Sequence, residues 1–173
     1  MPPTLRIDPE SAMTHGPTPV SLPHLVELTR TVAAEVRAGQ HPVTFDPDER
    51  WSVRLSSDPY TDVWLISWTQ EQSTELHDHA GSLGALTVVS GVVTERFWTP
   101  SRSRLRERRL RGGRGIGFPV GHVHDVVNTA PEPAVTVHAY SPPLTAMGYY
   151  EVDDAGALRR VRTILTAEPE PAR

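Results

Sequence analysis

Hydrophobic and polar residues follow two different periods along the chain, and the first of these periods is helical. In the segment SLPHLVELTRTVAAEVRAG, residues 21–39, apolar positions recur every three or four residues. One face of this segment carries Leu22, Leu25, Val26, Thr29, Val32 and Val36. Ser21 can cap such a helix, Pro23 suits its first turn, and Gly39 can end it. We therefore expect one amphipathic helix at the start of the folded domain.

From Trp51 onward the pattern changes to short runs rich in β-branched and aromatic residues, separated by turn residues. We expect about eleven strands, at residues 51–55, 62–68, 74–79, 85–91, 92–98, 104–111, 116–119, 123–128, 134–140, 147–152 and 158–165. The gaps between these runs are too short for crossover helices, so the pattern predicts an antiparallel barrel or sandwich. Proline-rich ends complete the organisation, with a flexible arm at 1–19, one domain at 20–165 and a second arm at 166–173.

Composition and charge narrow the classes of function. A length of 173 residues suits one domain, and a net charge of -4 provides no basic field for nucleic acid or an anionic membrane. The arginine-rich run at 102–114 lacks interleaved aromatic residues and is better explained as a charged edge strand. Cysteine is absent, which excludes disulfides, thiolate metal sites and a cysteine nucleophile. Without a signal peptide or a long apolar run, we expect a cytoplasmic monomer without nucleic-acid or membrane partners.

Closely spaced histidines are the first candidates for chemistry. In ELHDHAG, residues 75–81, His77 and His79 point to one face of a strand while Asp78 points to the other. Two imidazoles in this arrangement can occupy adjacent positions on one metal ion, although most such pairs have no ligand role. His122 and His124 form a second pair, and spacing alone does not decide which of these two is a ligand.

The spacing of these histidines resembles the two motifs of the cupin superfamily. The first motif, G-x5-H-x-H-x(3,4)-E-x6-G, keeps its spacing here, with Gly84 in place of the usual glutamate ligand and Glu71 in place of the leading glycine. The second motif, G-x5-P-x-G-x2-H-x3-N, is matched in full by Gly113, Pro119, Gly121, His124 and Asn128. The resemblance implies an all-β cupin (jelly-roll) β-barrel with a short N-terminal helical segment. It also implies that His77, His79 and His124 bind the metal, and that His122 is a turn residue or a neighbour of the ligands.

A third motif resembles the cysteine dioxygenase family within the cupins. That family carries a Ser-x-His-x-Tyr triad followed by Ser-Pro-Pro, and the run TVHAYSPP at residues 136–143 provides Thr136, His138 and Tyr140. A period of two places these three side chains on one face, where a chain of hydrogen bonds can orient the Tyr140 hydroxyl. Bacterial members of the family commonly have glycine at the Gly84 position, whereas animal members have a cysteine crosslinked to the tyrosine. With no cysteine in this chain, Tyr140 is expected to be unmodified.

The family also binds the substrate carboxylate with an arginine on an early strand. Arg54 is the first candidate for this role in RWSVRL, and Arg50 is the second. A solvent-exposed arginine with no role in binding is the alternative for either residue.

Three neutral imidazoles leave a divalent metal with its full charge and open positions for a chelating anionic substrate and O2. The resemblance implies Fe(II) as the metal. We expect a dioxygenase that adds both atoms of O2 to the sulfur of L-cysteine and produces cysteine sulfinic acid. One alternative is a dioxygenase for 3-mercaptopropionate or another small thiol, and a second is a cupin that binds a small ligand without turnover.

Overall fold

Eleven β-strands and one α-helix account for most of residues 19–169, the part of the chain that the computed structural model describes. The helix α1 spans Leu22–Arg37. The strands are β1 (Ser52–Ser57), β2 (Asp62–Trp68), β3 (His77–Asp78), β4 (Leu83–Ser90), β5 (Val92–Thr99), β6 (Arg104–Arg111), β7 (Gly115–Phe118), β8 (His124–Val127), β9 (Ala134–Ser141), β10 (Ala146–Val152) and β11 (Leu158–Leu165). A short 3-10 helix, Pro100–Arg102, connects β5 to β6.

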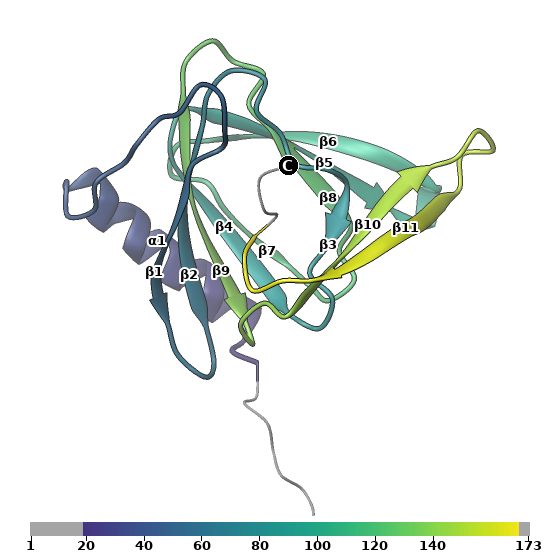
Figure 1. The fold of residues 1–173 in the computed structure, drawn as a ribbon, viewed down its shortest axis with the longest axis horizontal. Helices are drawn as coiled ribbons and strands as arrows, with labels where there is room; N and C mark the ends of the chain where they lie inside the picture. Colours follow the sequence, from purple (N-terminus) through teal and green to yellow (C-terminus); the bar gives the residue numbers. More distant parts are fainter. Residues whose placement is uncertain (1–18, 170–173) are drawn as a thin grey trace, which may run out of the picture.

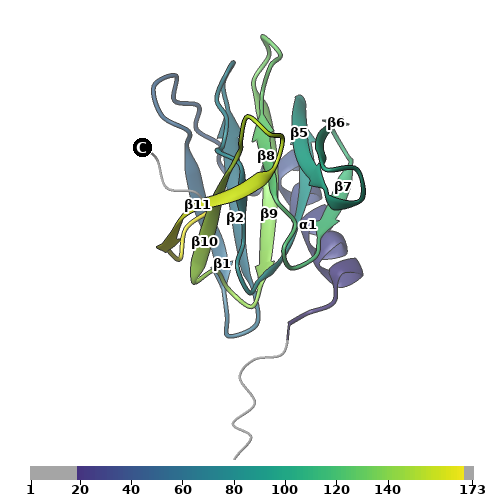
Figure 2. The same cartoon turned by 90° about the vertical axis from the view of Figure 1, so that its right-hand side faces the viewer.

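The strands form two antiparallel sheets that enclose a common interior (Figure 1). The five-stranded sheet has the order β1-β2-β9-β4-β7, and the six-stranded sheet has the order β11-β10-β3-β8-β5-β6. The turned view separates them, with β10 and β11 on the opposite side of the barrel from α1 (Figure 2). The predicted all-β cupin architecture with one N-terminal helix is confirmed, and β6, the arginine-rich strand, lies at a sheet edge as expected.

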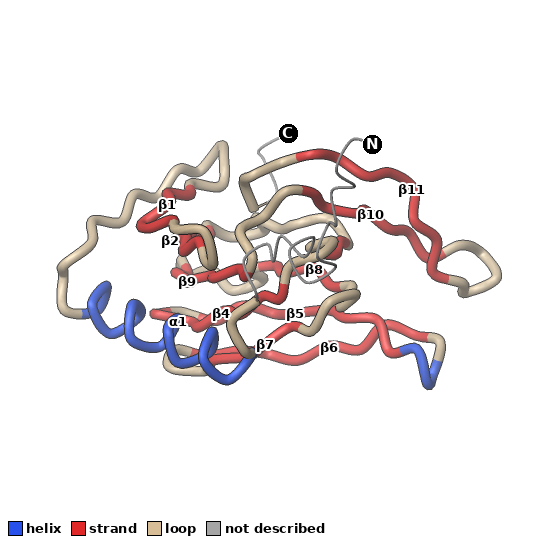
Figure 3. The backbone as a smooth tube through the Cα atoms, turned by 90° about the horizontal axis from the view of Figure 1, so that it is seen from below, coloured by secondary structure: helices blue, strands red, loops and turns tan. Residues whose placement is uncertain are grey.

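Two hydrophobic cores lie on the two faces of the five-stranded sheet, because alternate residues of β2 and β9 point in opposite directions. On the outer face, Leu25, Ala33 and Val36 of α1 pack against the sheet, and Figure 3 shows the helix lying along it. On the inner face, Trp64, Trp68 and Tyr140 belong to the core of the barrel. This alternation explains why every residue of β2 and of β9 is buried.

The helix differs from its prediction in its N-terminal cap and in its buried face, where Ala33 is buried and Leu22, Val26 and Val32 are only partly buried. It begins and ends where the sequence predicts, but the Ser21 side chain makes no capping hydrogen bond. Its buried residues are Leu25, Thr29, Ala33 and Val36.

The predicted strand at 74–79 is much shorter in the structure, where only His77–Asp78 is a strand. Before it, Thr74 donates its backbone N–H to Val126 O at 2.9 Å, outside a regular ladder. After it, Ala80 adopts a φ of 49°, which ends the extended backbone.

The two predicted arms fall largely outside the described residues. Residues 1–18 of the N-terminal arm and 170–173 of the C-terminal arm are not described. Within the described range, Pro169 is buried. Also within that range, no helix combines the length and the apolarity that crossing a membrane requires.

Candidate functional site

Three buried histidines meet inside the barrel at the centre of the six-stranded sheet. His77 and His124 are direct partners in the pairing of β3 with β8, and His79 follows β3 directly. The ring centroids of the three imidazoles lie 4.8 to 5.2 Å apart, and one nitrogen from each lies within 4.8 Å of the others. The structure therefore brings together the three residues that the sequence predicts as metal ligands.

The hydrogen bonds of His77 and His124 leave the Nε2 atom of each ring available to a metal ion. His77 Nδ1 lies 2.7 Å from the Glu75 carbonyl oxygen, and His124 Nδ1 lies 3.0 Å from Glu95 Oε1. The Glu75 carbonyl oxygen and the Glu95 carboxylate can only accept, so Nδ1 of each histidine carries the proton and Nε2 keeps its lone pair. Within residues 19–169, His124 Nε2 is buried and has no hydrogen-bond partner. An unpartnered buried nitrogen beside two further imidazoles fits a divalent metal ion.

The electrostatics of the cluster also favour neutral, metal-binding imidazoles. Burial and the neighbouring His124 lower the pKa of His77 well below its ordinary value, and burial together with His77 does the same for His79. For His124, burial lowers the pKa in spite of the opposing effect of the Glu95 carboxylate. Neutral imidazoles can bind a cation without first releasing a proton.

Glu95 is a functional residue that the sequence analysis missed. This fully buried carboxylate on β5 accepts hydrogen bonds from His124 Nδ1 at 3.0 Å and from His122 Nε2 at 2.9 Å, and it pairs with Arg108. Burial alone would raise the pKa of Glu95, but the bonds from His122, His124 and Arg108 outweigh burial and hold that pKa far below its usual range. Alternation along β5 could have indicated that Glu95 is buried, since Glu95 shares the inward face of its strand with Val93.

Asp78 points away from the three-histidine cluster, as the period of two predicts, and anchors the short strand that carries His77. Its Oδ1 accepts backbone N–H groups from Ala80 at 3.0 Å and Gly148 at 3.1 Å. Its Oδ2 accepts from the Tyr150 hydroxyl at 2.5 Å and from Arg160 at 3.2 Å. A buried carboxylate with four donors holds a two-residue strand in a fixed register.

Gly84 leaves no room for a side chain at the position where other cupins have a glutamate. It lies on β4 in the opposite sheet, directly opposite Tyr140 of β9. A Cβ atom at Gly84 would lie 2.8 Å from Phe118 Cδ2 and 3.4 Å from the Tyr140 ring. Close packing against Phe118 therefore explains why this position has no carboxylate.

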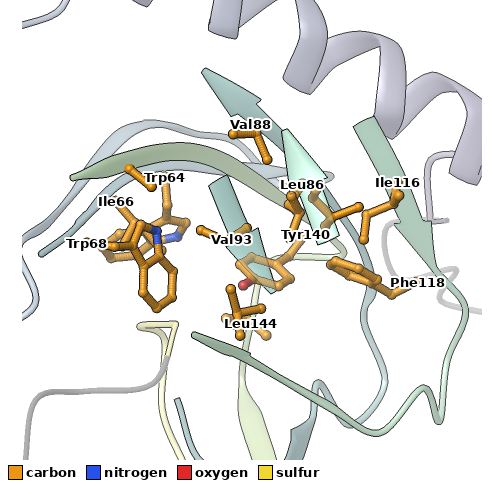
Figure 4. Close-up of a cluster of buried hydrophobic side chains, with 13 residues drawn as sticks. Trp64, Ile66, Trp68, Leu86, Val88, Val93, Ile116, Phe118, Tyr140 and Leu144 are labelled. Carbon is orange, nitrogen blue, oxygen red and sulfur yellow. The ribbon is translucent and has the colours of Figure 1, made fainter. Parts of the chain in front are cut away.

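Thr136, His138 and Tyr140 form a buried hydrogen-bonded row on the inner face of β9. Thr136 Oγ1 lies 2.9 Å from His138 Nε2, and the Tyr140 hydroxyl lies 3.4 Å from His138 Nδ1. Trp68 of β2 donates its Nε1–H to Thr136 Oγ1 at 2.8 Å, and Figure 4 shows Trp68 and Tyr140 within the same interior. The Tyr140 ring lies 4.8 Å from the His79 ring, between their centroids, so the row ends beside the metal cluster.

The two candidate arginines occupy different places. Arg54 on β1 is exposed, and its guanidinium carbon lies 5.4 Å from the Trp64 ring centroid. Arg50, just before β1, donates to the Ser73 carbonyl oxygen at 3.1 Å and lies 5.1 Å from the Trp68 ring centroid. Arg50 lines the pocket that contains the histidine cluster, and Arg54 is not among the lining residues.

The pocket itself is small, with about 290 Å³ of empty space, part of it open to solvent. It is lined by the three clustered histidines and by His138, Tyr140, Trp68 and Arg50. Pro169, which is buried at the end of the described chain, lines it as well. A space this limited suits a small molecule rather than a large one.

The barrel and its three-histidine cluster define a cupin-type metal protein. The sequence matches cysteine dioxygenase type I over residues 24–153. The chain belongs to the cysteine dioxygenase type I family, and it is therefore a cupin-type metal-dependent enzyme of the dioxygenase class. Among curated proteins, no match was found.

Solved structures with similar folds include three bacterial proteins. A protein from Thermus thermophilus is 21% identical with a TM-score of 0.51, over 58% of this chain and 90% of that one. A Klebsiella pneumoniae protein with a double-stranded β-helix domain is also 21% identical with a TM-score of 0.51, over 58% of this chain and 83% of that one. A cupin-superfamily sugar phosphate isomerase from Silicibacter pomeroyi is 21% identical with a TM-score of 0.50, over 66% of this chain and 77% of that one. At these identities the likeness establishes the fold.

Proposed function

We propose that this protein is an Fe(II)-dependent thiol dioxygenase that converts L-cysteine and O2 to cysteine sulfinic acid. The observation that carries the proposal is one small pocket lined by a three-histidine cluster, a buried tyrosine held by a histidine, and an arginine. A zwitterionic thiol substrate needs each of these groups. We further propose that the domain at 20–165 acts as a cytoplasmic monomer.

His77, His79 and His124 would hold the iron through their Nε2 atoms. Iron bound there would supply the redox chemistry that activates O2. With no carboxylate at Gly84, the three ligands contribute no negative charge, which favours binding of an anionic thiolate.

Arg50 would bind the substrate carboxylate. A guanidinium can make two parallel hydrogen bonds to a carboxylate, and contact with the Trp68 face and the Ser73 carbonyl holds Arg50 at the pocket wall. Arg54, the first candidate from the sequence, lies outside the lining residues, and we propose Arg50 in its place.

Tyr140 would orient the reacting groups by a hydrogen bond. Burial lowers the pKa of His138 to about 3, so this imidazole stays neutral and acts as a fixed hydrogen-bonding partner of Tyr140. The thiol supplies all the electrons for the addition of two oxygen atoms to sulfur, so no external reductant takes part.

The test is anaerobic reconstitution of the protein with Fe(II), followed by O2 uptake and product mass with cysteine, 3-mercaptopropionate and cysteamine in parallel. A product heavier than cysteine by two oxygen atoms, with cysteine preferred, is expected. No O2 uptake with any thiol would overturn the enzyme assignment.

A related dioxygenase that acts on 3-mercaptopropionate is the second candidate. The run Ser141-Pro142-Pro143 favours cysteine by resemblance, but the Ser141 hydroxyl donates to the Tyr60 carbonyl at 2.6 Å and accepts from Val20 N at 2.7 Å. Because Ser141 binds the backbone there, the parallel assay must decide between the thiols. A cupin that binds a ligand without turnover would give ligand binding but no O2 uptake.

A further inference from the structure

Trp68 extends the hydrogen-bonded row of Thr136, His138 and Tyr140, and the direction of its hydrogen bond is fixed. An indole N–H can only donate a hydrogen bond. Its acceptor, Thr136 Oγ1, is fully buried and lies 2.8 Å away. Trp68 is itself completely buried, so water cannot substitute for this bond.

The Thr136 hydroxyl has one hydrogen to place, and the surroundings restrict where it can go. Within residues 19–169, its only other hydrogen-bond partner is His138 Nε2, at 2.9 Å. If Nε2 carried the imidazole proton, the Thr136 hydrogen would be left buried without an acceptor, which is costly. Donation from Thr136 to an unprotonated Nε2 satisfies both groups.

We infer that Trp68 is a positioning residue that fixes His138 as its Nδ1-protonated tautomer and thereby makes Tyr140 a hydrogen-bond donor. With the proton on Nδ1, His138 donates to the Tyr140 oxygen, 3.4 Å away. The hydrogen of the Tyr140 hydroxyl is then directed to a group other than His138. The ring of Tyr140 lies beside His79, so this donor belongs to the pocket.

Trp68 also contacts Arg50 through its ring face, so a variant can separate the effect of Trp68 on Arg50 from its effect on Thr136. The Arg50 guanidinium carbon lies 5.1 Å from the centroid of the Trp68 ring, whereas Nε1 at the ring edge donates to Thr136 Oγ1. Trp68→Phe keeps an aromatic face, removes the N–H donor and leaves a small cavity, so the Thr136 pair below, which leaves Trp68 in place, serves as its control. The consequence for turnover rests on the proposed function, but the tautomer of His138 does not.

The direct test is nitrogen NMR of histidine side chains in the full chain, loaded with diamagnetic Zn(II) and with His138 assigned from a His138→Asn variant. The wild type is expected to show a protonated Nδ1 and an unprotonated Nε2 at His138, with about a tenfold or larger preference. In Trp68→Phe the buried Thr136 oxygen receives a donor only when His138 Nε2 is protonated. This gain offsets the cost of the unplaced hydroxyl hydrogen, so a mixture of tautomers is expected. A protonated Nε2 in the wild type, or the same ratio in Trp68→Phe, would overturn the inference.

Thr136 provides the matched pair. Thr136→Ser keeps the hydroxyl and is expected to retain the wild-type tautomer, whereas Thr136→Val has nearly the same shape and is expected to lose the preference. If both variants behaved alike, the relay through the hydroxyl would be refuted.

Turnover provides a second readout. Trp68→Phe is expected to lower kcat about tenfold while the KM for the thiol changes little, because Arg50 keeps its aromatic support. A rise in KM at unchanged kcat would contradict the positioning role. If the wild type turned over no thiol, the proposed function would fail while the NMR result still stood by itself.

Discussion

Replacement of Glu95 by glutamine tests whether this buried carboxylate orients a metal ligand. In the wild type, Glu95 accepts from His124 Nδ1 at 3.0 Å, from His122 Nε2 at 2.9 Å and from Arg108. A glutamine can still accept from His124 through its oxygen. Its amide nitrogen would then face the Arg108 guanidinium, so that one donor opposes another.

Loss of a partner that orients a metal-binding histidine typically weakens metal binding about 10- to 100-fold. This range corresponds to about 1.4 to 2.8 kcal/mol. Glu95→Gln keeps the contacts with His122 and His124, which share one oxygen, and loses only the contact with Arg108. It is expected near the lower end, about tenfold, whereas Glu95→Ala keeps no contact and is expected near 100-fold.

Competition titration of Zn(II) and Fe(II) against a chromophoric chelator measures these affinities directly. Glu107→Gln is the matched control, because Glu107 is an exposed glutamate on the neighbouring strand β6. It pairs with Arg96, so its side chain points to the outer face of the sheet, away from the histidines. Thermal unfolding of each metal-free variant separates misfolding from weakened binding. Unchanged affinity in both Glu95 variants would refute the orienting role.

Three further outcomes are expected. Gly84→Glu should lower stability by about 1–3 kcal/mol in chemical denaturation, because its Cβ would lie 2.8 Å from Phe118 Cδ2; unchanged stability would show that Phe118 moves freely. The pKa of His138 is lowered from 6.5 to about 3, so the unfolded chain binds the proton first as the pH falls. The contribution of neutral His138 to the free energy of unfolding of the metal-free protein should therefore be complete above pH 6.5. Below that pH it should fall by about 1 kcal/mol per pH unit. The fall should be smaller in His138→Asn. Arg50→Ala should raise the KM for cysteine at least tenfold, since it removes a charged hydrogen-bond donor from the pocket, whereas Arg54→Ala should leave it unchanged; the reverse order would restore Arg54 as the carboxylate-binding residue.

The strands and the histidine cluster were predictable because both depend on the local order and spacing of residues. Short runs of β-branched and aromatic residues between turn residues predicted the eleven strands, although β3 is shorter than expected. A two-residue spacing put His77 and His79 on one face. The spaced second motif selected His124 over His122, and the structure brings His124 together with His77 and His79.

Residues that meet only through the sheet pairing were harder to predict. Glu95 contacts His124 because β5 pairs with β8, and no spacing within either strand reports this contact. The choice between Arg50 and Arg54 depended on where the chain enters β1, and a four-residue difference in sequence moves the guanidinium from the pocket to the exposed edge. The sequence analysis did not single out Trp68, because its role depends on an N–H contact with Thr136 on another strand.

The two sheets divide the site between them. The three clustered histidines and Glu95 belong to the six-stranded sheet or to its immediate ends. By contrast, Thr136, His138 and Tyr140 belong to the five-stranded sheet. A glutamate at position 84 would have been a ligand from the five-stranded sheet, and glycine there leaves that sheet without one. Exchange of β2 and β9 between related cupins could therefore change the reaction while the metal stays in place, which makes this barrel a practical scaffold for chimeric enzymes.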